Sequence, residues 1–459
     1  MRADPSEYEL IVPANLGDAL TLLAERPKEW LPIAGGTDVM VQFAAGLLGT
    51  RKLLSIWNLP ELRRIEVFPD EIRIGAGSTY TDLRKHEPVA QEFPLLARAA
   101  SWTGGIANQN RGTLGGNIVN ASPAGDSLPA LLVYEAELIL VSARGERRVP
   151  YLDFHAGYKR MQLAEDELIL AICLKQRFSN WVSYARKVGA RNAQAIAKVC
   201  VAALGRIESG KVGDVRIALG SVAPIPIRLR ETERALSGKR LSAETVAMAR
   251  RTAMAETQPI DDIRSTTRYR AAVAGNLVGE FLEMLAKENQ GNVLARWNRL
   301  PAPEAETEIS PCCGSRAWAH GMVERRPIPD TDVLLSVSDE IWQSLGEQDW
   351  NEAFQSHPRM GESKAQRPVH QRSAAWSNEE QSSVTGDAEA IKAALAKGNQ
   401  AYERRFGRIF IVCATGKSGS EILETLRRRL QNDRATELRE TAEQQRLITH
   451  LRLKKWMSE

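Results

Sequence analysis

Few residues in this chain could form cross-links or hold a metal. The 459 residues include only five cysteines. They stand at positions 173, 200, 312, 313 and 413. This scattered spacing fits neither a disulfide framework nor a zinc site nor an iron–sulfur cluster. We therefore expect no metal on this chain.

The sequence also lacks a strong charge imbalance and long apolar runs. It has 61 basic and 57 acidic residues and a formal net charge of +4, so neither nucleic acid nor an anionic membrane is expected as the main partner. No apolar run is long enough to span a membrane, and residues 1–7 lack the apolar core of a secretory signal. A cytoplasmic location is therefore expected. The length predicts two or three domains, each able to bury a core.

A glycine-rich segment over residues 103–126 dominates the first half. It has six glycines among small polar residues and continues into an apolar run, which predicts a loop folded closely around a ligand. Glycine lets backbone N–H groups approach a phosphate, and Thr113, Asn117 and Ser122 add neutral donors. This chemistry suits a diphosphate-containing cofactor, with Asp126 accepting from a ribityl or ribose hydroxyl. Composition alone favours a plainer alternative, an array of glycine-rich turns between strands.

A second glycine motif favours the ligand-binding interpretation. Residues 33–41 place Gly35, Gly36 and Thr37 between a short apolar strand and another apolar run. Two phosphate-compatible segments in one domain predict a single long cofactor that lies across both.

These motifs resemble those of a known family. Residues 34–38 (AGGTD), 111–118 (RGTLGGNI) and 122–126 (SPAGD) are similar to the FAD-binding subunit of molybdenum hydroxylases, the group that contains xanthine dehydrogenase and carbon monoxide dehydrogenase. The resemblance continues through residues 184–199 and covers roughly residues 6–285. It implies that FAD is bound by Ala34, Gly35, Gly36, Thr37, Asp38, Thr113, Gly115, Gly116, Asn117, Ser122, Asp126 and Lys187. By itself, Lys187 would be interpreted as a solvated basic residue.

The resemblance also implies a fold and partners. The flavoprotein would have an α+β FAD-binding domain of two subdomains over residues 1–178 and a smaller α+β subdomain over residues 179–290. Such a hydroxylase passes electrons through [2Fe–2S] centres, which the cysteines of this chain cannot hold. We therefore expect a separate [2Fe–2S] subunit and a molybdopterin-binding large subunit as partners. FAD would pass the electrons to NAD+ as co-substrate, and the sequence does not distinguish NAD+ from oxygen as the final acceptor.

The second half of the chain differs in composition. Residues 291–308 are polar and broken by prolines, which predicts a short flexible linker. Residues 309–459 have helical patterning with little β pattern, which predicts an all-α domain. The chain as a whole is thus expected to be multidomain.

Two motifs in the helical half imitate functional ones. Residues 414–418 (ATGKS) resemble the end of a phosphate-binding loop, but position 411 is Ile where that loop needs Gly. Ser418 and Glu421 instead have the spacing of a helix capping box. The triple arginine at 427–429 predicts a solvated helix face with one inward member.

His357 and Glu380 are the candidates for acid–base chemistry in this half. By spacing alone, a lone histidine before a proline is more often a surface residue. The surrounding motifs, among them residues 357–362 (HPRMGE) and 377–381 (SNEEQ), closely resemble 2-oxo-4-hydroxy-4-carboxy-5-ureidoimidazoline (OHCU) decarboxylase. This family is all-helical, uses no metal or organic cofactor, and forms S-allantoin and carbon dioxide.

The resemblance implies roles for individual residues in this domain. His357 would be the acid/base group and Glu380 its orienting or proton-handling partner. The implied substrate contacts are Pro358, Ser377, Gln381, Ile411, Val412, Cys413, Ala414 and Arg429.

The two resemblances together predict a bifunctional protein of purine catabolism, because one family produces urate and the other acts two steps beyond it. An alternative keeps the flavin half as a subunit of a carbon monoxide or aldehyde dehydrogenase with a non-catalytic helical appendage. A second alternative is a flavin-free scaffold that only mediates assembly.

Overall fold

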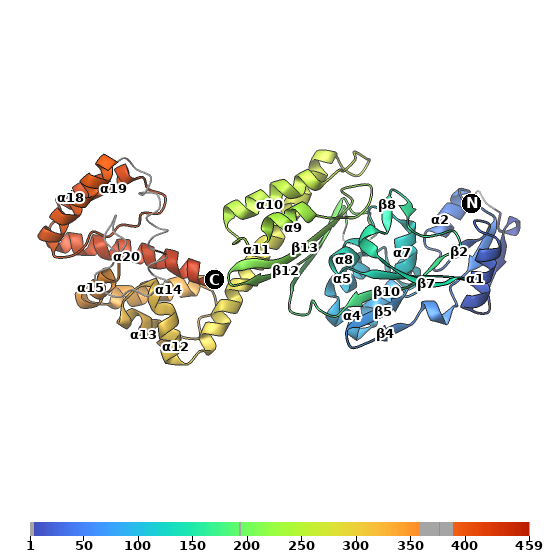
Figure 1. The fold of residues 1–459 in the computed structure, drawn as a ribbon, viewed down its shortest axis with the longest axis horizontal. Helices are drawn as coiled ribbons and strands as arrows, with labels where there is room; N and C mark the ends of the chain where they lie inside the picture. The colour runs from blue at the N-terminus through green and yellow to red at the C-terminus, as the bar shows by residue number, and fades with distance from the viewer. Residues whose placement is uncertain (1–3, 192–193, 358–375, 377–388, 459) are drawn as a thin grey trace. The chain divides into compact units, whose positions relative to one another are not determined.

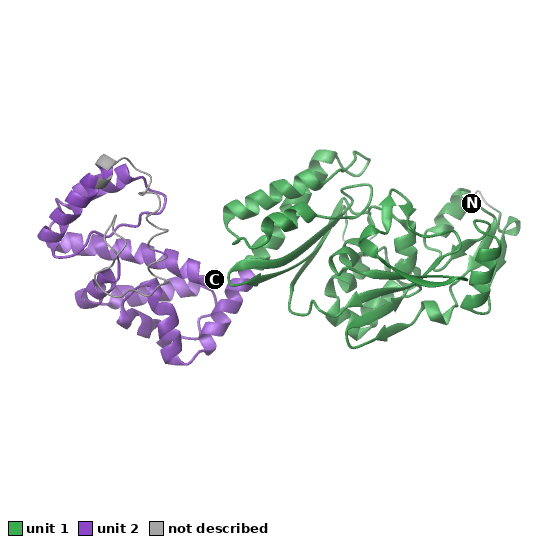
Figure 2. Cartoon of the chain, viewed as in Figure 1, with its two compact units in different colours: residues 1–286 green, residues 287–459 purple. Residues whose placement is uncertain are grey.

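The computed structural model describes residues 4–191, 194–357, 376 and 389–458. The chain divides into two compact units, unit 1 over residues 1–286 and unit 2 over residues 287–459 (Figure 2). Each unit contains hydrophobic cores.

A small parallel sheet begins unit 1 (Figure 1). In the spatial order β1–β3–β2, its strands are β1 (Glu9–Ile11), β3 (Lys52–Ser55) and β2 (Leu31–Ile33). The helices of this region are α1 (Leu16–Glu25) and α2 (Val39–Ala45). Asn15 caps the start of α1, because its side chain accepts a hydrogen bond from the Asp18 amide at 2.9 Å.

The second sheet of unit 1 is antiparallel and carries the main core. In spatial order its strands are β4 (Ile65–Val67), β5 (Glu71–Gly75), β10 (Leu168–Lys175), β6 (Glu137–Ser142) and β7 (Gly145–Pro150). The accompanying helices are α3 (Tyr80–Lys85), α4 (Glu87–Glu92), α5 (Pro94–Trp102), α6 (Ile106–Arg111), α7 (Leu114–Asn120) and α8 (Leu128–Val133). A small hairpin, β8 (His155–Gly157) and β9 (Arg160–Met161), follows β7. Fully buried Leu96, Leu131 and Ile172 join helices and sheet in one hydrophobic cluster.

The third sheet of unit 1 is also antiparallel. Its strands are β11 (Val182–Val188), β12 (Val199–Glu208), β13 (Lys211–Gly220) and β14 (Ile227–Arg228). The helices α9 (Arg230–Leu236), α10 (Ala243–Glu256) and α11 (Thr267–Arg299) follow it in the chain. Phe281 and Leu285 of α11 pack in one cluster with Val201 and Ile217 of the sheet, so this subdomain has a core separate from that of the second sheet.

Unit 2, in its described residues, consists of helices joined by non-helical segments, among them residues 409–414. Its helices are the end of α11, then α12 (Ala302–Ile309), α13 (Arg316–Glu324), α14 (Thr331–Ser344), α15 (Glu347–Gln355), α18 (Glu389–Phe406), α19 (Gly419–Arg429) and α20 (Arg434–Met457). Ser418 and Glu421 form the predicted capping box at the start of α19. The multidomain α+β and all-α architecture expected from the sequence is thereby confirmed. None of the helices in the described parts of the chain is both long and apolar enough to cross a membrane.

Two local predictions are wrong. Residues 103–126 are not a continuous loop, because α6 and α7 form within them, and Thr113 provides the cap that starts α7. Residues 291–308 are not a flexible linker either. The helix α11 continues to Arg299, and α12 begins at Ala302. Pro301 and Pro303 do not interrupt helical structure here, because they occupy the start of α12, where proline is tolerated.

Candidate functional sites

The two glycine motifs of unit 1 lie against each other. A β-carbon on residue 35 would come within 1.6 Å of the Arg111 carbonyl oxygen. The Arg111 Nε donates to the Gly35 carbonyl oxygen at 3.3 Å. Glycine is therefore required at position 35 by the close approach of two backbones. The contact holds the motifs side by side, as a single cofactor lying across both would need.

Thr113 fixes the conformation of the second motif. Its Oγ1 accepts from the Gly116 amide at 3.1 Å, and its backbone forms an isolated bridge with Thr79. A β-carbon on Gly115 would lie 2.6 Å from that of Ala76, so this glycine allows α7 to pack closely beside the end of β5. Gly116 faces the other way and is exposed.

Backbone donors around these motifs are open to a ligand. Among the described residues, the amides of Gly36 and Thr37 have no backbone partner, and Thr37 is exposed. Gly36 has a φ of 77°, which glycine adopts without strain. Open N–H groups on such backbone suit a diphosphate, so the residues present fit FAD.

Asp126 and Lys187 form a buried ion pair beside the glycine-rich segment. Lys187 Nζ lies 2.6 Å from Asp126 Oδ2 and 3.2 Å from the Trp102 carbonyl oxygen. The Asp126 and Lys187 side chains are only 8% and 4% exposed. Burial raises the pKa of Asp126 to about 6, although Lys187 acts in the opposite sense. The pair ties strand β11 to the segment that precedes α8.

Asp126 and Lys187 were predicted as separate cofactor contacts, and the structure shows that they contact each other. Asp126 Oδ1 is buried and has no hydrogen-bond partner among the described residues. It therefore keeps one acceptor, which matches the hydroxyl-binding role expected of Asp126. Both Lys187 donor contacts are internal, so a direct contact between Lys187 and FAD stays a prediction.

Arg111 and Trp57, beside the first glycine motif, were not among the predicted site residues, although Arg111 opens the motif of residues 111–118. The Arg111 guanidinium lies 3.9 Å from the centre of the Trp57 ring, and Arg63 lies 4.6 Å from the same ring. Trp57 thus holds Arg111 where the two glycine motifs meet. The only available signal was that Arg111 immediately precedes the Gly112–Thr113 pair.

In unit 2, His357 occupies a buried position just beyond the end of α15. Its backbone amide donates to the Phe354 carbonyl oxygen at 3.2 Å, and the residue is 8% exposed. Burial first, and then the positive charge of Arg452, hold the pKa of His357 well below its usual value. The imidazole is therefore neutral at pH 7 and able to accept a proton.

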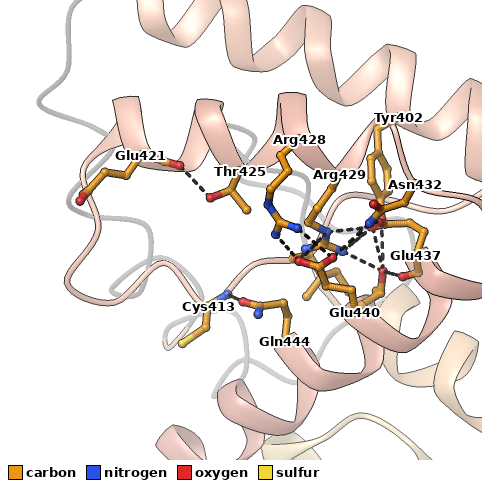
Figure 3. Close-up of polar contacts among 12 residues, drawn as sticks. Tyr402, Cys413, Glu421, Thr425, Arg428, Arg429, Asn432, Glu437, Glu440 and Gln444 are labelled. Carbon is orange, nitrogen blue, oxygen red and sulfur yellow. Dashed lines mark hydrogen bonds and ion pairs between the residues drawn. The ribbon is translucent and has the colours of Figure 1, made fainter.

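The predicted substrate-binding segment, residues 411–414, is fixed by two side chains (Figure 3). Arg429 Nη1 donates to the Ile411 carbonyl oxygen at 2.7 Å. The Cys413 amide donates to Gln444 Oε1 at 3.0 Å. Ile411, Val412 and Ala414 are buried, and Cys413 is partly exposed.

Arg429 is the inward member of the arginine triple, as predicted. Its side chain is completely buried, and it bonds Glu437 Oε1 through Nε at 2.8 Å and Thr441 Oγ1 through Nη2 at 2.9 Å. Figure 3 shows Arg429 together with Glu437 and with Tyr402, to whose hydroxyl it also donates. The guanidinium is thus surrounded by internal partners, and a direct substrate contact by Arg429 has no support in this geometry. Its observed role is to hold the 411–414 segment through the hydrogen bond to the Ile411 carbonyl oxygen.

Four other predicted residues of this site lie outside the described residues. They are Pro358, Ser377, Glu380 and Gln381. Among the residues that the structure does describe, no group of three or more acidic, histidine or cysteine side chains could hold a metal ion.

Comparisons with known proteins divide the chain in the same two parts. Residues 6–174 match the family model for the FAD binding domain in molybdopterin dehydrogenase, and residues 184–285 match that for the CO dehydrogenase flavoprotein C-terminal domain. Residues 298–454 match the OHCU decarboxylase model.

Individual proteins are similar to parts of this chain. The xanthine dehydrogenase FAD-binding subunit of Escherichia coli O157:H7 is 34% identical over 56% of this chain and 88% of its own length. The structure of carbon monoxide dehydrogenase from Hydrogenophaga pseudoflava is 30% identical, with a TM-score of 0.58, over 60% of this chain and 96% of that one. An OHCU decarboxylase crystallised in the presence of (S)-allantoin is 31% identical over 33% of this chain and 96% of its own, with a TM-score of 0.29.

One family assignment follows from these findings, because the glycine motifs lie side by side and family models match parts of both units. The chain belongs to the family of FAD-binding subunits of molybdenum hydroxylase-type dehydrogenases, and it carries an OHCU decarboxylase domain fused behind the flavoprotein.

Proposed function

We propose that this protein serves purine breakdown at two steps. Unit 1 would be the FAD subunit of a xanthine dehydrogenase-type complex that takes electrons from a [2Fe–2S] partner and passes them to NAD+. A molybdopterin-binding large subunit would complete that complex. Unit 2 would convert OHCU to S-allantoin and carbon dioxide. The proposal is supported by the relative named as a xanthine dehydrogenase subunit and by the fusion to an OHCU decarboxylase domain.

In unit 1, FAD would supply the redox chemistry, and the protein would supply position and electrostatics. The Gly35–Thr37 backbone and the Thr113–Asn117 turn would hold the diphosphate, with Ala34, Asp38 and Ser122 beside them. Asp126 would accept from a sugar hydroxyl through Oδ1, which has no hydrogen-bond partner among the described residues. Lys187 would keep that carboxyl in place.

In unit 2, His357 would be the acid/base group. The observation that carries this proposal is that the imidazole is buried and neutral, and so able to take up a proton. Loss of carbon dioxide leaves electron density that the substrate ring can absorb, so the protein need only orient the carboxylate and deliver a proton to one face.

The other residues of the decarboxylase site would orient the substrate. Glu380 would steer the proton, and Pro358, Ser377 and Gln381 would contact the substrate. The backbone of residues 411–414 would line the pocket, held there by Arg429.

The full-length chain tests this proposal directly. OHCU generated in situ should disappear faster than by spontaneous decay, and circular dichroism should report S-allantoin. The variant His357→Asn should remain folded and lose this activity. A folded wild-type chain that produces racemic allantoin at the spontaneous rate would refute the assignment of unit 2.

A separate experiment addresses the substrate of unit 1. The flavin in a complex reconstituted with the partner subunits should be reduced by xanthine. Reduction by carbon monoxide or an aldehyde, and not by xanthine, would support the alternative in which unit 1 belongs to another hydroxylase. NAD+ and oxygen are then compared as oxidants of the reduced complex.

A further inference from the structure

Helix α20 carries a row of buried polar side chains. Glu437, Thr441, Gln445 and Thr449 recur every four residues and are all buried, and Arg452 continues the row. Four-residue spacing places them on one face of the helix. Burying polar groups is costly unless they are hydrogen-bonded, so the partners of each member show what the row does.

The partners change along the row. Glu437 and Thr441 bond the buried Arg429 and so belong to the network that holds the 411–414 segment. Gln445 lies one turn further along and does not bond this arginine in the structure. Its place in the row connects the Arg429 network with the region around His357.

The orientation of the Gln445 amide is fixed by two acceptors. Its Nε2 donates to the Cys313 carbonyl oxygen at 3.2 Å and to Thr449 Oγ1 at 3.3 Å. The Thr449 hydroxyl in turn donates to the Gln445 carbonyl oxygen at 3.0 Å. With both amide protons used, Oε1 is left as an acceptor, and it has no partner among the described residues.

The residue after Cys313 lies against the segment that carries His357, because a β-carbon on Gly314 would come within 2.2 Å of Ser356 Oγ. A second unsatisfied atom belongs to His357. Its Nε2 is buried and also lacks a hydrogen-bond partner among the described residues. Two side chains of α20 affect the pKa of His357: Arg452 lowers it and Gln445 raises it. A ring N–H and an amide oxygen are complementary, and hydrogen bonds of catalytic groups are often long without substrate and shorten when it binds.

We propose that Gln445 is a positioning residue for His357. Its amide oxygen accepts from the Nε2–H of the imidazole and thereby leaves the lone pair on Nδ1, the nitrogen that exchanges a proton with the substrate. The inference rests on the proposed acid/base role of His357. It adds that Gln445 selects which nitrogen of the His357 ring carries the proton.

Other titratable groups near the imidazole do not compete for this proton at neutral pH. Arg452 of α20 is a cation that favours the neutral ring. The Cys313 thiol, just before α13, has a pKa raised by burial to about 12. Glu352 of α15 bonds the Arg316 side chain at 2.7 Å.

The test combines a spectrum with kinetics on the full-length chain. After labelling the six histidines with ¹⁵N, the His357 signals are assigned by their loss in His357→Asn. The expected spectrum is that of a neutral ring protonated on Nε2. In Gln445→Met, which keeps the side-chain length and removes the acceptor, we expect a mixture of tautomers and a fall in kcat of about tenfold with KM nearly unchanged.

Two further variants control the experiment. Gln343→Met changes an exposed glutamine of α14 and should leave spectrum and kinetics as in the wild type. Gln445→Glu restores an acceptor and adds a negative charge, so it should recover part of kcat and move the acid limb of the pH–rate profile to higher pH.

Two results would overturn the inference. One is a wild-type ring protonated on Nδ1. The other is a Gln445→Glu variant whose pH profile matches that of the wild type. Because the tautomer is measured without substrate, this outcome is distinct from failure of the proposed function, which appears as retained activity in His357→Asn.

Discussion

The two units build their candidate sites in different ways. In unit 1 the cofactor-facing surface is mostly backbone, and it exists because glycines allow distant segments to touch, as Gly35 and Arg111 do. In unit 2 the site depends on side chains buried along a single helix, from Glu437 to Arg452. A backbone site is destroyed by adding atoms, whereas a buried side-chain network is destroyed by removing them.

The largest effect should come from removing a charge in unit 2. Arg429→Ala leaves Glu437 buried without its cation, and breaking a buried pair costs about 3–5 kcal/mol. We expect unit 2 to unfold at much lower temperature and to lose decarboxylation, while bound flavin is unchanged, as followed by calorimetry and flavin absorbance. The neighbouring exposed arginine gives the control, since Arg427→Ala should change stability by less than about 0.5 kcal/mol. Equal stability of the two variants would contradict the network.

The converse change in unit 1 adds one methyl group. Gly35→Ala would place its β-carbon against the Arg111 carbonyl oxygen, and overpacking of this kind costs about 1–3 kcal/mol. Flavin content per chain should fall about tenfold or more, whereas decarboxylation persists. Gly49→Ala, where a β-carbon meets no atom within 4 Å, should keep its flavin. Full flavin content in Gly35→Ala would show that the contact between the motifs is not needed.

The pH dependence of stability should have opposite signs in the two sites. The folded pKa of Asp126, about 6, lies above its usual 3.8, so the native state binds more protons between these values and this carboxyl's contribution falls as pH rises through that window. Asp126→Asn should remove about 1–3 kcal/mol of this dependence, measured by urea unfolding of the flavin-free chain at several pH values.

His357 gives the opposite sign. Its folded pKa lies well below 6.5, so protonation favours the unfolded state, and its contribution is lost as pH falls below 6.5. The difference in unfolding free energy between wild type and His357→Asn should therefore shift in favour of the variant on acidification. An unchanged difference from pH 7 to pH 5 would mean that the imidazole is not buried as a neutral group.

The smallest expected effect concerns the aromatic support of Arg111. Trp57→Leu removes the ring beneath the guanidinium, a contact worth about 0.5–1 kcal/mol near the surface. The Kd for FAD, measured by quenching of flavin fluorescence in the apo-protein, should rise about two- to fivefold. Trp57→Phe keeps a ring and should stay close to the wild type. Identical affinities in all three proteins would remove Trp57 from the site.

How far the sequence predicted these features depends on the kind of interaction. Local rules succeeded: Ser418 begins a helix where its capping-box spacing with Glu421 predicts one. The inward turn of one arginine in the 427–429 triple was also predicted. Such features depend on neighbours within a few residues, which the sequence displays directly.

Contacts between distant segments were the ones that the sequence could not supply. Nothing local indicates that Lys187 would meet Asp126, 61 positions earlier, or that Gln445 would bond the Cys313 backbone, 132 positions away. The helices within residues 103–126 were missed because six glycines suggested a loop, while the Thr113 cap and the packing of Gly115 on Ala76 stabilise α7.

Helix α11 has a consequence for how such a fusion can be cut or recombined. Its residues Phe281 and Leu285 belong to a core of unit 1, whereas Leu294 and Trp297 belong to the core of unit 2, where the Trp297 indole also donates to the Ala305 carbonyl oxygen at 3.0 Å. A gene fragment that begins at residue 309 would encode a decarboxylase domain that lacks the buried residues Leu294, Trp297 and Ala305 and keeps only the last residue of α12. The exchangeable module therefore begins near residue 287, inside a helix. A breakpoint at the prolines after this helix would separate the decarboxylase domain from part of its own core.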